Sequence, residues 1–199
     1  MNFPTSITKV EPINKNFKIT WFLEKACNFD CSYCSSSDHQ FVSGRYKHKP
    51  MSLTDMKTYW LRIYHHISKI HKEVDVAFTG GEVTINKNFL PFIKWLTTHF
   101  NDILCNIYVT SNGSASTQYY VDLNKYITHL TLSTHMEFIN ENKFFGTLLK
   151  LNNINKSINS SEKLYVQVME ETFYDADKIK VYESFMIMHS IPYIIVEIT

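Results

Sequence analysis

The sequence has little glycine, little proline, almost no net charge and no long apolar run, and each shortage excludes a class of protein. Five glycines and five prolines in 199 residues exclude collagen-like, repeat-linker and low-complexity chains. Twenty basic residues against 19 acidic ones leave a net charge of +1, so no global field attracts nucleic acid or an acidic membrane. Apolar residues still make up 44% of the chain, which is enough for a buried core.

Segments that would direct the chain into a membrane or out of the cell are not recognisable. Residues 1–16 mix Pro4, Lys9 and Glu11 among apolar side chains and lack the continuous apolar stretch of a secretory signal. No stretch approaches the roughly 20 apolar residues of a membrane helix. We therefore expect a cytoplasmic protein without membrane contact, in which thiols stay reduced and clustered cysteines bind metal more often than they form disulfides.

Strand and helix patterns alternate along the rest of the chain. Aromatic and β-branched runs predict strands over residues 17–22, 74–78, 104–109, 129–132, 164–169 and 193–198. Apolar residues at helical spacing predict helices over residues 52–70, 88–100, 117–126, 140–152 and 175–188. Strands separated by helices imply parallel pairing with right-handed crossovers. We interpret residues 17–199 as one α/β domain, preceded by an N-terminal extension over residues 1–16.

Two α/β architectures fit this alternation, a doubly wound open sheet and a partial barrel. Chemically promising residues follow the carboxyl ends of the first four predicted strands. Barrels place their sites at these ends, whereas open sheets do so only near a switch point. The position of these residues therefore favours a partial (β/α)6 barrel with parallel strands.

Cysteine is scarce, but three of the four cysteines lie within eight residues. Cys27, Cys31 and Cys34 form a C-x3-C-x2-C array in a polar loop after the first predicted strand. Three thiolates at this spacing can bind one soft metal centre from a single loop. A structural zinc ion would need a fourth ligand, for which His39 and His48 are nearby. An iron–sulfur cube held by three cysteines instead leaves one iron open to an external ligand.

With this spacing, and with an aromatic residue, Tyr33, before the last cysteine, the sequence resembles the radical S-adenosylmethionine enzymes. The resemblance implies an open (β/α)6 barrel and a [4Fe–4S] cluster on Cys27, Cys31 and Cys34. It also implies that a flavodoxin- or ferredoxin-like donor supplies one electron for the cleavage of S-adenosylmethionine. The products would be methionine and a 5′-deoxyadenosyl radical that abstracts hydrogen from a substrate. Tyr33 would lie against the adenine.

Three further strand ends carry residues that the resemblance assigns to S-adenosylmethionine. The Gly80-Gly81-Glu82 stretch would bind the amino group of its methionine moiety, with Glu82 as the anchor, and Ser133 would contact the carboxylate. By itself the first stretch also fits an ordinary glycine turn with a solvated acid. Asn112 follows the third strand in a sequence that fits an Asn-Gly turn as well as a cofactor contact.

The sequence leaves the substrate open between a peptide or protein side chain, a glycyl-radical partner and a small metabolite. His135, after the fourth predicted strand, is a candidate for facing the substrate and equally fits an inert loop histidine. Cys105, alone in an apolar strand, predicts a packing residue. The balanced charge predicts no nucleic-acid partner. Two alternatives to an enzyme remain, a non-catalytic zinc or iron–sulfur module and a cluster-binding partner subunit.

Overall fold

An all-parallel sheet runs through the computed structural model of the protein, which describes residues 16–34, 41–42, 45–46, 50–71, 73–171 and 176–198. In these residues the sheet has six strands in the order β1-β4-β5-β6-β7-β8, so each strand pairs with the next one along the chain. The strands are β1 (Phe17–Glu24), β4 (Val74–Gly80), β5 (Leu104–Ser111), β6 (His129–Thr134), β7 (Leu164–Glu171) and β8 (Tyr193–Ile198). Two short strands, β2 (Phe41–Val42) and β3 (Arg45–Tyr46), pair with each other.

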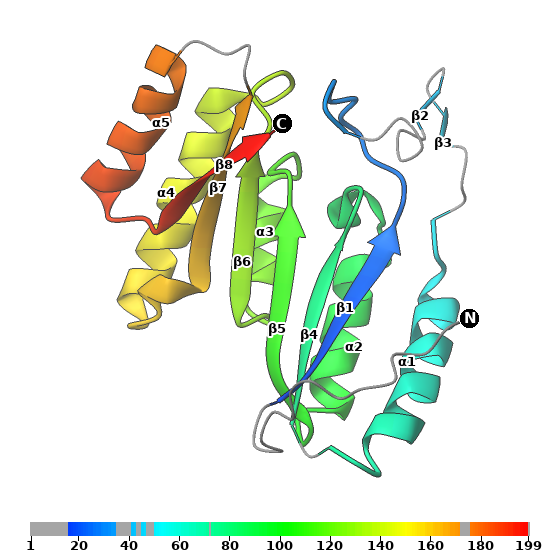
Figure 1. Cartoon of the computed structure of the whole chain (residues 1–199). Helices are drawn as coiled ribbons and strands as arrows, with labels where there is room; N and C mark the ends of the chain where they lie inside the picture. Colours follow the sequence, from blue (N-terminus) through cyan, green and yellow to red (C-terminus); the bar gives the residue numbers. More distant parts are fainter. Residues whose placement is uncertain are drawn as a thin grey trace, which may run out of the picture.

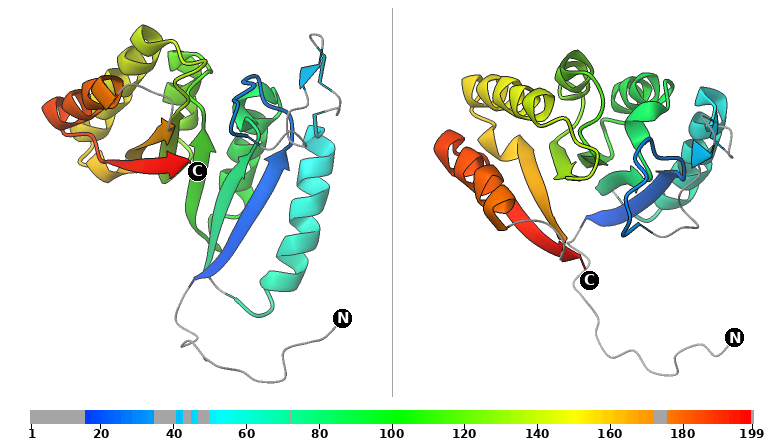
Figure 2. Two further views of the ribbon diagram at one scale, coloured as in Figure 1. Left: turned by 45° about the horizontal axis from the view of Figure 1, so that its top comes forward. Right: turned by 90° about the horizontal axis from the view of Figure 1, so that it is seen from above.

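Helices connect the successive strands of the sheet. They are α1 (Leu53–Ile67), α2 (Phe89–His99), α3 (Thr117–Leu123), α4 (Glu141–Ser157) and α5 (Ala176–His189), with short 3-10 turns η1 (Val83–Ile85) and η2 (Ser161–Lys163). Seen from above, the strands follow an arc with these helices on its outer side, and the arc is open between β1 and β8 (Figures 1 and 2). A doubly wound sheet would carry helices on both faces. The structure therefore confirms the predicted partial (β/α)6 barrel.

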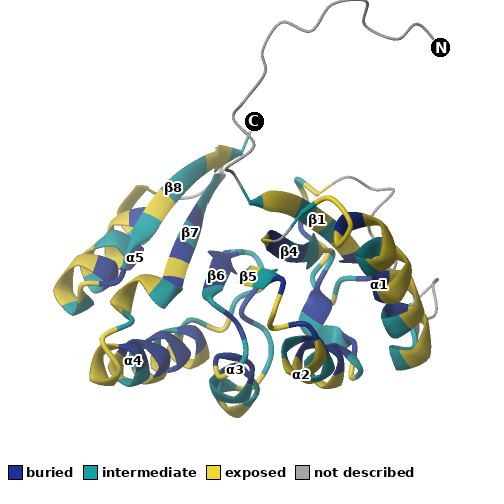
Figure 3. Cartoon of the chain, turned by 90° about the horizontal axis from the view of Figure 1, so that it is seen from below, coloured by how far each residue is buried: buried dark blue, intermediate teal, exposed yellow. Residues whose placement is uncertain are grey.

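The core lies between the outer helices and the convex face of the sheet, as the burial colouring shows (Figure 3). The helix α1 illustrates how the sequence produces it. Ser52 caps the helix by accepting a hydrogen bond from the Asp55 backbone N–H at 3.1 Å, and Met56 and Trp60 then follow on the buried face. Each fully buried large apolar side chain contributes about 1.5–3 kcal/mol. The largest of them are Trp60, Tyr120, Tyr182, Phe78, Phe89, Phe92, Phe144, Met56, Ile93, Leu96, Leu123 and Leu130.

The predicted elements are all present, with differences at their ends. β1 and β5 each run two residues further than predicted, to Glu24 and Ser111, and α4 ends five residues later, at Ser157. Cys105 is exposed on β5, so the prediction that it packs in the core is wrong. The predicted extension falls outside the described residues except for Asn16, and so do His39 and His48. No helix in the described part of the chain has the length and apolar character needed to cross a bilayer.

Candidate active site

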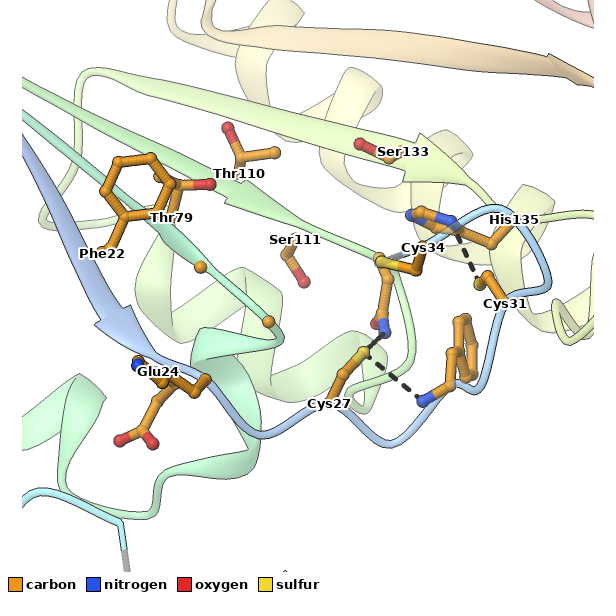
Figure 4. A pocket seen from close by; sticks show the side chains of 15 residues that line it. Phe22, Glu24, Cys27, Cys31, Cys34, Thr79, Thr110, Ser111, Ser133 and His135 are labelled. Atoms are coloured by element: carbon orange, nitrogen blue, oxygen red, sulfur yellow. Dashed lines mark hydrogen bonds between the residues drawn. The ribbon is translucent and has the colours of Figure 1, made fainter. Parts of the chain in front are cut away.

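A cavity of about 400 Å³ opens where β1, β4, β5 and β6 end (Figure 4). Parallel strands bring their carboxyl ends to the same edge of the sheet, so residues distant in sequence meet there. All three clustered cysteines line the cavity. Its full lining is Phe22, Glu24, Lys25, Cys27, Phe29, Cys31, Cys34, Thr79, Gly80, Gly81, Thr110, Ser111, Asn112, Ser133 and His135.

The cysteine loop, residues 25–34, holds the three thiols at different depths. Cys27 is half-buried, Cys31 is buried and Cys34 is exposed. A turn in which the Cys34 N–H donates to the Cys31 carbonyl at 3.1 Å sets the spacing of the last two. The Cys27 sulfur accepts hydrogen bonds from the Phe29 N–H at 3.4 Å and from Asn112 Nδ2 at 3.7 Å. The loop thus places three soft ligands around one space.

The electrostatic surroundings keep two of these thiols protonated in the metal-free protein. Burial raises the pKa of Cys31 to about 12 and also raises the pKa of Cys27. Both thiols are therefore neutral at pH 7. A bound cation reverses this preference, because metal coordination deprotonates a thiol outright.

The three thiols border one cavity, and the two histidines considered as a fourth zinc ligand, His39 and His48, lie outside the described residues. No group of three or more His, Cys, Asp or Glu side chains within the described ranges is arranged to hold a metal ion. A mononuclear zinc site needs its ligands to converge on one atom. A cube presents a different iron to each thiolate and so accepts cysteines that are further apart but border one cavity. The three thiols around this cavity meet that requirement.

The two glycines at the end of β4 allow an unusually close approach of the β1 backbone. The Gly81 N–H donates to the Glu24 carbonyl at 2.7 Å, and the Glu82 N–H donates to the Ala26 carbonyl at 2.8 Å. A Cβ atom on Gly80 would lie 2.2 Å from the Glu24 carbonyl oxygen, and one on Gly81 would lie 2.3 Å from that of Ala26. Gly80 also has a φ of +138°, which disfavours other residues. Both glycines therefore fix the start of the cysteine loop while bordering the cavity.

Glu82 lies beneath the cavity rather than in its lining. Its side chain is 0% exposed, so a solvated acid is excluded. The carboxylate accepts hydrogen bonds from the Thr84 N–H at 2.9 Å, the Ser111 hydroxyl at 2.8 Å and the Asn112 N–H at 2.6 Å. These bonds tie the end of β4 to the end of β5. Contact of this carboxylate with a cofactor stays a prediction, and the structure puts the backbone of Gly80 and Gly81 at the cavity wall instead.

The remaining predicted cofactor residues divide between the cavity wall and its rim. Asn112 and Ser133 are buried and line the wall. Ser133 donates to Gln167 Oε1 on the neighbouring strand at 3.2 Å. The Tyr33 ring stacks on His135 with a centroid distance of 5.9 Å and lies outside the lining. The structure thus brings Gly80, Gly81, Asn112 and Ser133 together around the thiols.

His135 contributes to the thiol end of the cavity. Its Nδ1 atom lies 3.5 Å from the Cys31 sulfur and also contacts the Tyr33 hydroxyl. Burial lowers the pKa of His135 to about 4, so the ring is neutral at pH 7. His135 therefore contacts the Cys31 thiol as an uncharged hydrogen-bonding group.

Sequence reasoning missed two acids of this region, Glu24 and Glu137. Glu137, which follows β6, accepts two hydrogen bonds from Ser32 in the cysteine loop. Glu24 is 6% exposed, and its carboxylate accepts a hydrogen bond from the Met51 N–H at 3.3 Å and another from Asn86 Nδ2. Neither acid belongs to a recognisable motif, so only the tertiary pairing reveals them.

The buried Glu24 should make the stability of the wild-type protein fall as the pH rises. Burial raises the pKa of Glu24, which means that the folded state binds this proton more tightly than the unfolded state. The resulting stabilisation is complete below the unfolded pKa of about 4.3 and is lost as the pH rises through the raised value. A Glu24→Gln variant keeps the acceptor oxygen and lacks the titration. Urea unfolding at pH 4 and pH 7 measures the free energy of unfolding of both proteins. We expect the variant to be more stable relative to wild type at pH 7 than at pH 4. The same difference in free energy at both pH values would contradict this.

Comparison with solved structures finds the same architecture. A crystal structure of BtrN in complex with AdoMet and 2-DOIA superimposes with a TM-score of 0.57 and 22% sequence identity, over 77% of this chain and 57% of BtrN. The likeness shows the fold. A selenomethionine structure of BtrN in an open conformation matches with a TM-score of 0.46 and 21% identity, over 65% of this chain and 55% of that one. This chain thus spans little more than half the length of BtrN. No protein-family model matches the chain, and no curated protein does either.

Proposed function

We propose that the protein is a radical S-adenosylmethionine enzyme. The observation that carries the proposal is that Cys27, Cys31 and Cys34 line one cavity at the carboxyl edge of a partial barrel. The similar fold of BtrN, crystallised with AdoMet, supports the same assignment. The proposed reaction is an oxidoreductive one that abstracts a hydrogen atom from the substrate.

Different residues of the cavity would bind the cluster and the methionine moiety of S-adenosylmethionine. Cys27, Cys31 and Cys34 would hold a [4Fe–4S] cluster, which when bound supplies the electron that cleaves S-adenosylmethionine to methionine and a 5′-deoxyadenosyl radical. Asn112 orients the Cys27 thiol through its side-chain amide. Ser133 offers a buried hydroxyl for the methionine carboxylate.

Other residues would position the rest of S-adenosylmethionine. The Gly80 and Gly81 backbone lines the wall assigned to the methionine amino group, above the buried Glu82. Tyr33, on the rim beside His135, is proposed to lie against the adenine.

The end of the cavity away from the thiols is the proposed place for the substrate. Phe22, 74% exposed, stands beside Thr79 on the next strand, and Thr110 follows on β5 (Figure 4). This end offers two hydroxyls and an aromatic ring. The charged residues of the lining that lie nearest in sequence, Glu24 and Lys25, come at and directly after the end of β1. A small polar metabolite or a peptide side chain would match this end of the cavity. We further propose a flavodoxin- or ferredoxin-like electron donor and a cytoplasmic location.

Anaerobic reconstitution with iron and sulfide tests the proposed function. The reconstituted protein should contain about four irons with equal acid-labile sulfide. On addition of dithionite and S-adenosylmethionine it should release 5′-deoxyadenosine, measured by chromatography. Zinc without sulfide in protein purified under anaerobic conditions would favour the structural zinc module, and a reduced cluster that never cleaves S-adenosylmethionine would favour a partner subunit.

A further inference from the structure

The turn that follows β6 holds the cysteine loop from the opposite side of the cavity. The cysteine loop leaves β1 at one edge of the sheet, whereas β6 is the fourth strand in sheet order. The turn, residues 135–138, is itself ordered by two hydrogen bonds in which the Phe138 and Ile139 N–H groups donate to the His135 carbonyl, at 3.0 and 2.9 Å. We call these four residues the clamp turn.

Glu137 makes the polar part of this contact. One of its carboxylate oxygens accepts a hydrogen bond from the Ser32 backbone N–H at 2.8 Å, and the other accepts one from the Ser32 hydroxyl. A loop outside helices and sheets must find partners for its backbone N–H groups elsewhere. Hydrogen bonds to a carboxylate are generally about twice as strong as those between neutral groups. Ser32 lies directly after Cys31, so the carboxylate fixes the backbone between two of the thiols.

Aromatic rings make the apolar part. Phe29 stacks on Phe138 with ring centroids 5.6 Å apart and meets His135 edge-on at 6.1 Å. Tyr33 stacks on His135 with ring centroids 5.9 Å apart. The clamp turn therefore contacts the cysteine loop at Phe29, Ser32 and Tyr33, on both sides of Cys31. Each aromatic pair adds about 0.5–1.5 kcal/mol beyond its buried area.

We propose that Glu137 is a positioning residue for the cysteine loop, setting the place and the electrostatic surroundings of the Cys31 sulfur. The electrostatic half of this proposal rests on the proposed cluster, whereas the positioning half does not. A carboxylate at this position adds negative charge beside the cluster, and nearby charge and hydrogen bonds set the reduction potential of such centres. Removal of the charge should therefore make the cluster easier to reduce.

Three variants separate these effects. Glu137→Ala removes the acceptor and the charge, and Glu137→Gln keeps an acceptor oxygen while it removes the charge. Glu162→Gln is the control, since Glu162 is an exposed acid in η2, just before the amino end of β7.

Hydrogen–deuterium exchange of the metal-free full chain tests the positioning. The peptide that contains Ser32 should exchange about tenfold faster in Glu137→Ala than in wild type, with a smaller effect in Glu137→Gln and none in the control. Equal exchange in Glu137→Ala and the control would overturn the proposal. This result is obtained whether or not the protein binds a cluster.

Redox titration of the reconstituted protein tests the electrostatic half. The midpoint potential of Glu137→Gln should lie above that of wild type, with an altered EPR signal of the reduced cluster, while Glu162→Gln matches wild type in both. An unchanged potential and signal in Glu137→Gln would overturn this half. If no variant, wild type included, binds iron, the proposed function and the electrostatic half both fail, and the exchange experiment still decides the positioning role.

Discussion

Replacing Cys31 with serine should reduce the iron content of the reconstituted protein from about four atoms per chain to well below one. Cys31 is the buried one of the three thiols that line the cavity, 4% exposed, and lies between the other two in sequence. A serine hydroxyl is a hard ligand with a far higher pKa than a thiol, so it binds iron–sulfur centres poorly. Iron and acid-labile sulfide analysis of anaerobically reconstituted protein measures the effect, and cleavage of S-adenosylmethionine should disappear with the iron.

The fourth cysteine provides the matched control for this experiment. Cys105 is exposed on β5 and lies outside the cavity lining, so Cys105→Ser should keep the full iron content. Urea unfolding of both metal-free variants shows whether the fold is intact. Iron binding by Cys31→Ser at the level of Cys105→Ser would contradict the assignment of Cys31 as a ligand.

Replacing Gly80 with alanine should destabilise the protein by about 3 kcal/mol or more, which is a large part of the stability of a small domain. The added Cβ would lie 2.2 Å from the Glu24 carbonyl oxygen, a backbone atom that cannot rotate away. The backbone φ of +138° adds a conformational cost of about 1–3 kcal/mol. Chemical denaturation measures the loss. Because β1 would have to move from β4, the same variant should bind iron poorly.

Gly146 offers a control, because the same substitution there should have the opposite effect on stability. It lies within α4, and a Cβ atom there would meet nothing within 4 Å. Gly146→Ala should therefore stabilise the helix by about 0.5–1 kcal/mol. If Gly80→Ala were as stable as Gly146→Ala, the close approach of β1 and β4 would not be the reason for the glycine.

Periodicity was sufficient to predict the α/β class and the order of the main strands and helices, but not the curvature of the sheet. In the described residues, the six strands of the main sheet and the five α-helices each correspond to an apolar pattern in the sequence, since a helix covers one side of each of these strands. The short strands β2 and β3 were not predicted. The curvature that distinguishes a partial barrel from an open sheet was inferred from the residues after the strands. Element ends were less predictable, because pairing with a neighbour can extend a strand through a polar residue such as Glu24.

In the candidate site, only the residues that belong to a short sequence motif were predictable. The spacing of Cys27, Cys31 and Cys34 identified three residues that line the cavity. The burial of Glu82 could not be foreseen, because it depends on Ser111 and Asn112, which lie 29 and 30 residues away. Nothing near Glu137 in the sequence indicates its contact with Ser32, 105 residues earlier. Such pairs depend on where two loops meet at the end of the sheet.

The contacts between the clamp turn and the cysteine loop also set an order of assembly during synthesis. They join residues separated by 102 to 109 positions, so a nascent chain that has not yet emerged as far as β6 cannot make them. The cysteine loop therefore leaves the ribosome 105 residues before the Glu137 carboxylate that binds Ser32. During that interval the loop is free of the turn that later holds it. The proposed cluster would therefore be assembled in its held loop only after the clamp turn has emerged from the ribosome.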